Sequence, residues 1–152
     1  MDASDVIAAL ALVSIPVSLL IARWQMRAAL RVERARWQAE ARRTAYELFQ
    51  NALTQFRRSL LASEVVLEEL KEATHALHNA AHVVSQVGPD AVGRLATRIT
   101  RRYEQTTREV GEEILSGRSP SSEARAWAWA ASAPLRVKLD NAINRVYDSQ
   151  WE

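Results

Sequence analysis

The first strongly apolar stretch of the chain is residues 6–22, which hold 17 consecutive uncharged positions. As a helix, this stretch spans about 25 Å, slightly less than the roughly 30 Å hydrocarbon core of a bilayer. Arg23 and Arg27 can lengthen the span by extending their side chains to the interface. The alternative is a core helix of a soluble bundle, but such a helix usually shows a polar stripe. Only two serines interrupt this run, so the pattern predicts a transmembrane helix.

The charges that flank this run predict its orientation. Residues 1–5 contain two acids and no basic side chain, whereas five arginines follow the run closely. Positive charge favours the cytoplasmic side, so we expect a single-pass protein of the cell membrane with residues 1–5 outside and residues 23–152 cytoplasmic. The acidic start also argues against a cleaved signal peptide. The residues expected to anchor the chain in the membrane are Arg23, Trp24, Arg27 and Arg31.

After a basic stalk over residues 23–36, apolar positions recur every three or four residues, which is typical of helices. The pattern divides residues 37–152 into four segments, at about 37–62, 64–87, 90–116 and 122–150. The predicted inward faces are Trp37, Ala41, Ala45, Leu48, Ala52, Phe56 and Leu60; Val66, Leu70, Ala73, Leu77, Ala80, Val84 and Val87; Val92, Ala96, Ile99, Tyr103, Thr106, Val110 and Ile114; and Trp127, Ala131, Leu135, Leu139, Ala142 and Val146.

Glycine, proline and serine mark the segment ends. Gly88 suits a left-handed residue after a helix, and Pro89 suits the first turn of the next helix. Ser121 or Ser122 can cap the last helix. Pro134 lies inside that helix and predicts a kink or a split, because proline lacks the N–H that a helix interior requires.

The sequence LLASEVV leaves one turn open, since it contains neither Gly nor Pro. Without a turn there, one helix would run unbroken to Val87. A turn near Ala62–Ser63 gives four segments of similar length, which is the pattern of an up-down four-helix bundle. We therefore predict an all-α protein, in which a transmembrane helix continues into a stalk and then into a bundle over 37–152. A long coiled-coil hairpin, completed by a second chain, is the alternative.

The composition excludes several kinds of chemistry. The chain has no cysteine, which excludes disulfides, thiolate metal sites and cysteine nucleophiles. It also has no glycine-rich phosphate loop, nucleophile elbow or HExxH motif. We therefore expect a protein that is not an enzyme and needs no cofactor.

The basic stretch RAALRVERARWQAEARR raises the question of nucleic-acid binding. Glu33 and Glu40 lower its potential, and no recognition-helix pattern accompanies it. Attraction of its arginines to anionic lipid explains it better. We therefore expect membrane lipid as a partner and no nucleic acid.

The three histidines of the chain form a stripe within HALHNAAH, at His75, His78 and His82. Spacings of three and four place them on one helical face, where imidazoles can share a metal ion. That face is opposite the inward positions Leu70 and Leu77, so a solvated surface is the alternative. The stripe gives the hypothesis of a surface metal site or a pH-responsive site.

Two tryptophans in EARAWAWAASAP are candidates for partner contact. Trp127 and Trp129 point about 200° apart on a helix, so they cannot face one core together. With Trp127 inward, Trp129 is outside and can anchor an interface, or it covers a neighbouring helix. Trp151 is similarly placed for a partner or oligomer contact.

The N-terminal apolar run, the arginine-rich RVERARWQAEARRTAYELF and the junction VVSQVGPDAVGRLA give the chain a family resemblance. It resembles a loose class of uncharacterised single-span, membrane-anchored helical proteins of GC-rich actinobacteria and their phages and plasmids. That resemblance implies no activity and assigns no functional residue.

The leading functional hypothesis is a non-enzymatic, membrane-tethered adaptor or assembly module. Its cytoplasmic bundle would bind a second copy of itself or another protein. The alternatives are a phage- or mobile-element-encoded membrane protein for exclusion or immunity, less readily a holin-like one, and a metal- or pH-responsive sensor that uses the histidine stripe.

Overall fold

A computed structural model describes residues 3–148 and the side chains of residues 19–148. The described residues form helices joined by short loops and contain no strand, which confirms the predicted all-α class. The chain divides into two units, Met1–Glu40 and Ala41–Glu152. The helices are α1 (Ala3–Leu61), α2 (Leu67–Val87), α3 (Asp90–Leu115), α4 (Ser122–Ala131) and α5 (Ala133–Asp148).

The first unit consists of helix α1 as far as Glu40. From Leu19 onward its side chains are exposed, apart from the half-buried Ala39. Among the residues that the structure describes, no helix combines the length and the apolar character that a membrane crossing requires. Most of the predicted span, residues 6–18, lies outside the residues whose side chains are described.

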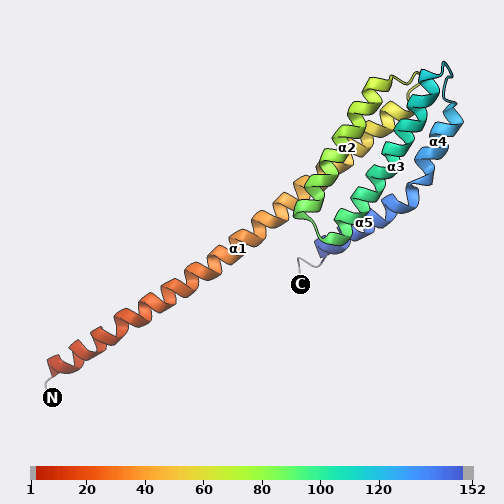
Figure 1. Ribbon diagram of the computed structural model, residues 1–152. Helices are drawn as coiled ribbons and strands as arrows, with labels where there is room; N and C mark the ends of the chain where they lie inside the picture. The colour runs from red at the N-terminus through yellow and green to blue at the C-terminus, as the bar shows by residue number, and fades with distance from the viewer. Residues whose placement is uncertain (1–2, 149–152) are drawn as a thin grey trace. The chain divides into compact units, whose positions relative to one another are not determined.

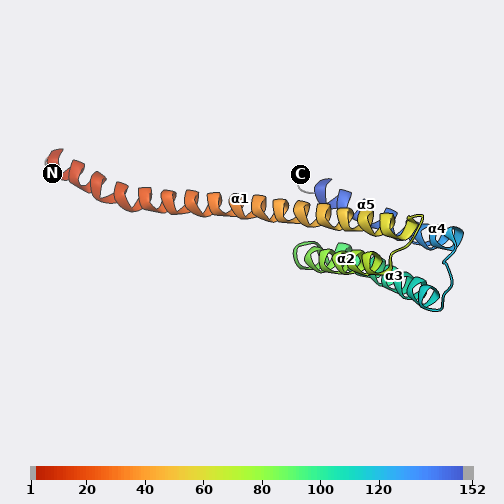
Figure 2. The ribbon, with the colours of Figure 1, turned by 90° about the horizontal axis from the view of Figure 1, so that it is seen from above.

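The second unit is a bundle built from the end of α1, the helices α2 and α3, and an arm formed by α4 and α5. Successive members run in opposite directions, as Figure 1 shows. Figure 2 shows two layers, with α2 beside α3 in one and the end of α1 beside α4 and α5 in the other. The up-down order expected for four helices is therefore present, with the fourth helix divided in two.

The turn that the sequence left open lies between α1 and α2. Helix α1 ends at Leu61, and residues 62–66 are not helical. An unbroken helix to Val87 is therefore wrong. The second helix begins at Leu67, three residues later than the segment expected from residue 64.

The core confirms the predicted faces of α2 and α3. The buried hydrophobic residues of these two helices are Leu70, Ala73, Leu77, Ala80, Ala81, Val84, Val92, Ala96, Ile99, Tyr103 and Val110. At the ends of the predicted α2 face, however, Val66 is exposed and Val87 is only half-buried.

Two predictions for α1 are wrong. Trp37 is 73% exposed and belongs to the first unit, and Leu48 is 49% exposed. Phe49 is buried in place of Leu48. At 3.6 residues per turn the inward face advances from Ala45 to Phe49 and then to Ala52, and a step of three from Ala45 leaves that face.

Gly88 serves a different purpose from the one predicted. Its φ of −89° is not left-handed. A Cβ at this position would lie 2.8 Å from the Val84 carbonyl oxygen and 3.1 Å from the Tyr46 hydroxyl, so the turn requires a residue without a side chain. Pro89 precedes α3 at its N-cap and lies outside the first turn. The left-handed glycine of the described residues is Gly117, with φ of 75°.

The predicted split near Pro134 is confirmed. Helix α4 ends at Ala131 and α5 begins at Ala133, so Pro134 occupies the first turn of α5, where its missing N–H is not needed. Ser132 is buried at the break, and its carbonyl accepts from the N–H groups of Leu135 and Arg136. Ser121 caps α4, since its Oγ accepts from the Ala124 N–H at 3.1 Å.

Candidate functional site

Trp129 packs inside the bundle on an aromatic column. Its indole stacks on the Tyr103 ring with 5.4 Å between centroids and 9° between planes. The centroids of the Tyr103 and Phe56 rings are 4.5 Å apart. Helices α1, α3 and α4 therefore meet through three aromatic side chains, a geometry that adds stability beyond area burial.

Two arginines complete this cluster. The Arg136 guanidinium lies 3.9 Å from the Trp129 ring centroid, and that of Arg57 lies 5.7 Å away. Arg136 also donates to the Trp129 carbonyl at 2.8 Å and to the Tyr103 hydroxyl. A cation over an indole is stabilised by the ring quadrupole, so Trp129 is held from several sides.

The predicted inward orientation of Trp127 is therefore wrong, and the alternative that Trp129 covers a neighbouring helix is confirmed. Trp129 is half-buried in the bundle, and Trp127, expected inward, is 68% exposed. The residue that sets the rotation of α4 is Arg125, which is buried. Two residues from Arg125, Trp127 points to the opposite side of the helix.

Arg125 contacts the carboxyl end of α1. Its Nη1 donates to the carbonyl oxygens of Leu60 at 2.9 Å and Ala62 at 2.6 Å. The last carbonyls of a helix lack partners within the helix and carry partial negative charge, which a guanidinium satisfies. Its Nε is buried and has no hydrogen-bond partner among the described residues.

Exposed Trp127 borders a groove between α3 and α4 with a volume of about 480 Å³. Arg102 and Glu109 line the groove from α3, and Glu123 lines it from α4. We call this the Trp127 groove. It combines a large apolar side chain with two carboxylates on an otherwise polar surface.

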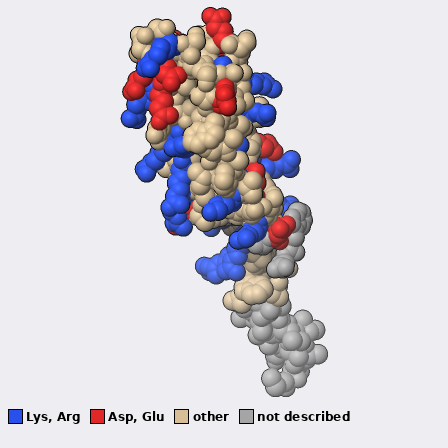
Figure 3. Space-filling view, turned by 90° about the vertical axis from the view of Figure 1, so that its right-hand side faces the viewer, with Lys and Arg blue, Asp and Glu red and all other residues tan. Residues whose placement is uncertain are grey.

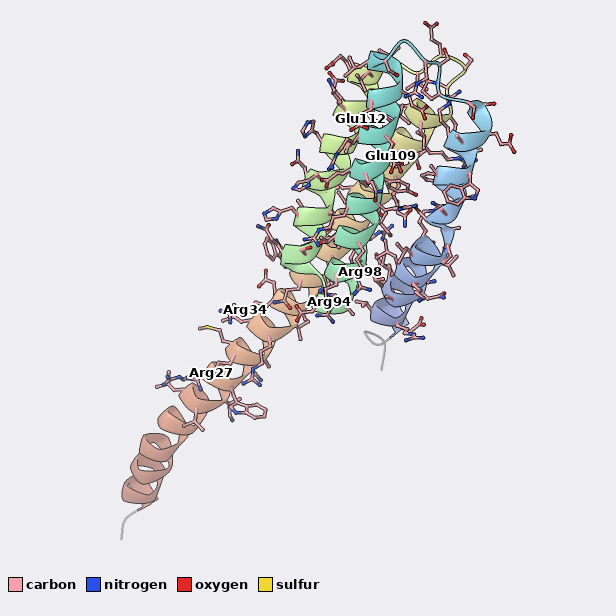
Figure 4. All side chains as sticks on the ribbon, turned by 45° about the vertical axis from the view of Figure 1, so that its right-hand side comes forward. Arg27, Arg34, Arg94, Arg98, Glu109 and Glu112 are labelled. Carbon is pink, nitrogen blue, oxygen red and sulfur yellow. The ribbon has the colours of Figure 1, made fainter. Side chains whose placement is uncertain are left out.

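Acidic residues are concentrated at the same end of the bundle. Helix α3 ends with Glu112 and Glu113, and α2 begins with Glu68 and Glu69. Figure 3 shows acidic side chains near the end that carries the two loops, and Figure 4 labels Glu109 and Glu112 there. This end of the bundle is therefore rich in carboxylates, while Arg102 lines the Trp127 groove itself and Glu112 lines a hollow on the α2 side of α3.

Burial governs the ionisation of the tyrosines at this core. Burial raises the pKa of Tyr103, and the Ser132 hydroxyl and the Arg136 guanidinium partly oppose the rise. Burial likewise raises the pKa of Tyr46, against a lowering by Arg42. Both phenols therefore stay neutral well into the alkaline range, as a packed core requires.

The histidine stripe is exposed, as the solvated-surface alternative predicts. His78 Nδ1 lies 2.9 Å from a Glu104 carboxylate oxygen, and His82 Nε2 lies 3.0 Å from the Gln86 amide nitrogen. Within the part of the chain that the structure describes, no group of three or more His, Asp or Glu side chains is arranged to hold a metal ion. The arrangement of the described side chains therefore does not support a metal site formed by His75, His78 and His82.

The predicted anchoring residues are on the exposed helix of the first unit. Arg23, Trp24, Arg27 and Arg31 are all exposed there, and Figure 4 labels Arg27 on this helix. Their contact with lipid stays a prediction. Trp151 lies outside the described residues.

Trp127 as the exposed tryptophan and Arg125 as a buried cation were not predicted from the sequence. The signal was present in the register: Arg125, Trp129 and Ser132 are spaced by four and three and form the true inward face. Because arginine is rarely buried, a pattern of apolar residues alone selects the wrong face.

No family model, curated protein or solved structure matches this chain. The resemblance to membrane-anchored actinobacterial and phage proteins therefore stays a prediction.

Proposed function

We propose that the protein is a non-enzymatic, membrane-tethered adaptor whose bundle binds a protein partner at the Trp127 groove. The observation that carries the binding role is the 68% exposed indole of Trp127 beside a groove on a polar surface. Tryptophan is among the residues most enriched at the energetic centres of interfaces. Tethering rests on the uncharged run at 6–22 and the arginines that follow it.

The surroundings of the groove favour one chemistry of partner. Two carboxylates, Glu109 and Glu123, and one cation, Arg102, line it, and Glu113 lies on the next turn of α3. A segment that places an apolar side chain against Trp127 and a lysine or arginine beside it complements this surface. Such a pairing steers the encounter by charge and is weakened by salt.

The binding test compares two exposed tryptophans in the full chain. A photo-crosslinker beside position 127 captures the partner in cells, and the identified partner is then titrated against purified protein. We expect Trp127→Ala to weaken binding at least tenfold, which corresponds to about 1.4 kcal/mol. The matched control is Trp37→Ala, since Trp37 is 73% exposed and lies outside the bundle. Equal affinity of the Trp127→Ala variant and the wild type would refute the groove as the binding site.

The tether needs a separate test. Carbonate washing of cell membranes should leave the full chain in the pellet, and Leu12→Arg together with Leu20→Arg should release it. Recovery of the unchanged chain in the wash would disprove tethering and would leave the binding result intact. A role in exclusion or immunity and a metal- or pH-responsive role stay as alternative proposals.

A further inference from the structure

A second surface, on the opposite half of α3, carries three arginines in a row. Arg94, Arg98 and Arg101 are spaced by four and three and therefore lie along one face of the helix. All three are exposed, and Figure 4 shows Arg94 and Arg98 on the part of α3 nearest its start.

These arginines line a continuous hollow between α2 and α3, which we call the arginine groove. One part, of about 400 Å³, is lined by Arg94, Arg98 and Arg101. The adjoining part, of about 220 Å³, is lined by Arg101 together with His78 and His82. The two parts share Ser85, Thr97 and Arg101 as lining residues.

The groove floor is formed where the two helices approach closely. A Cβ at Gly93 would lie 3.1 Å from the Cα of Ser85, so α3 needs a glycine at this crossing. The hydroxyls of Ser85 and Thr97 donate to the carbonyls of Ala81 and Gly93, both at 2.9 Å. The charged hydrogen-bond donors of the groove are therefore the guanidinium groups, beside the imidazoles of His78 and His82.

The positive charge of the groove, from three arginines, exceeds the negative charge of its lining. Among the described residues, no ion pair or hydrogen bond joins Arg94, Arg98 or Arg101 to another side chain. Asp90 and Glu104 are the acids of the lining, and Glu104 already pairs with His78.

The arrangement is unfavourable for α3 as an isolated helix. Between residues 90 and 102 the helix carries four arginines and one acid, and between residues 103 and 115 four acids and one arginine. Like charges three or four positions apart destabilise a helix by about 0.2–0.5 kcal/mol per pair. Local rules that are broken without internal compensation are expected at functional sites.

We propose that the arginine groove binds a phosphate group. A guanidinium presents a planar fork of donors that matches phosphate oxygens, and such charge-assisted bonds are about twice as strong as neutral ones. The guanidinium groups of three arginines on one face of α3 line the same hollow. The group belongs to a soluble phosphate ester or to an anionic lipid headgroup, which share this chemistry.

The dimensions and lining distinguish this ligand from a nucleic acid. From Arg94 to Arg101 the helix rises about 10 Å, enough for one or two phosphates but not for a long run of backbone. Single-stranded nucleic acids also require aromatic side chains on which bases stack, and no Phe, Tyr or Trp lines either part of the groove.

The experiment titrates the full chain, purified in an uncharged detergent, with inorganic phosphate and with glycerol phosphate by calorimetry. The test variant is Arg94→Gln, Arg98→Gln and Arg101→Gln combined. The control variant combines Arg58→Gln, Arg108→Gln and Arg145→Gln, which removes the same charge from exposed positions outside the groove. A second arm replaces the detergent by mixed micelles that carry an anionic phospholipid.

We expect saturable binding that weakens at least tenfold in the test variant and less than twofold in the control. Binding of the soluble phosphates supports the proposal with a soluble ligand, and binding confined to the anionic micelles supports it with a lipid headgroup. Equal weakening in both variants would show a diffuse charge effect and overturn the proposal. Absence of saturable binding by the wild type in both arms would also overturn it.

Discussion

Helices α2 and α3 and the α4–α5 arm are held in one bundle by different kinds of contact. The α2–α3 pair interlocks through fully buried aliphatic residues such as Leu70, Leu77 and Ile99, and through the close approach at Gly93. The arm buries few aliphatic residues, chiefly Leu139 and Ile143.

The arm depends on directed contacts instead. Arg125 binds the end carbonyls of α1, Arg136 lies over Trp129, and Ser121 caps α4. Burial of apolar area tolerates small shifts, whereas a hydrogen bond or a ring contact requires one geometry. The pair therefore buries more aliphatic side chains than the arm, and the arm is fixed in position by a few directed contacts.

Leu77→Ala should have the largest effect, because it removes a fully buried side chain from the α2–α3 pair. We expect the free energy of unfolding to fall by about 2–5 kcal/mol, measured by chemical denaturation with circular dichroism. Val83→Ala on the same helix, at an exposed position, should change it by less than about 0.5 kcal/mol. Similar losses in the two variants would contradict the assignment of the core.

Arg125→Met should have the second-largest effect on stability, because it leaves the Leu60 and Ala62 carbonyls without their hydrogen-bond donor. We expect a loss of about 1–3 kcal/mol in the free energy of unfolding, from the same denaturation measurement. Arg125→Lys, which keeps the charge, should recover part of it. If Arg125→Met is no worse than Arg108→Met at an exposed position, the arm does not depend on this contact.

Ser121→Ala should cost about 1 kcal/mol, the usual value of an N-cap side chain. Ser122 is the first residue of α4 and is not its N-cap, so Ser122→Ala serves as the neighbouring control. Hydrogen exchange of the α4 amides should accelerate in the first variant and stay unchanged in the second. Equal exchange rates of the α4 amides in the two variants would mean that the Ser121 cap does not stabilise the arm.

The smallest effect should appear only at alkaline pH. Because burial raises the pKa of Tyr103 above its ordinary 10.0, the folded state keeps the phenol proton when the unfolded state has lost it. This contribution to stability is complete below pH 10.0 and declines as the pH rises through the folded-state pKa. In Tyr103→Phe the free energy of unfolding should therefore fall less steeply above pH 10, as measured by denaturation at a series of pH values. The same slope in the variant and the wild type would contradict this role of Tyr103.

The contrast between pair and arm also explains what the sequence predicts well. In α2 and α3 aliphatic residues recur at helical spacing, so the inward faces and their order in the bundle are readable. The inward face of α4 and its C-cap consists of Arg125, Trp129 and Ser132. Because two of these three residues are polar, the face does not appear in a pattern of apolar positions. The exposure of Trp127 depends on that rotation, whereas the sequence pattern placed Trp127 inward and offered Trp129 for partner contact.

The arginine groove could not be predicted from the sequence for a related reason. Arg94, Arg98 and Arg101 read as an ordinary solvated face when α3 is considered alone. The hollow is lined by both α2 and α3, and Gly93 and Ser85 approach closely within it. Contacts between helices of this kind cannot be read from the periodicity of either helix.

The Arg125 contact has a consequence for the order in which the domain is made. The carbonyls of Leu60 and Ala62 precede their donor by 65 and 63 positions. During synthesis the amino-terminal part of a chain emerges first, so α1 is made before Arg125, the residue that binds its end carbonyls. They acquire their protein donor after both α2 and α3 have been translated. The first helix of the bundle is thus completed by nearly the last one to be synthesised.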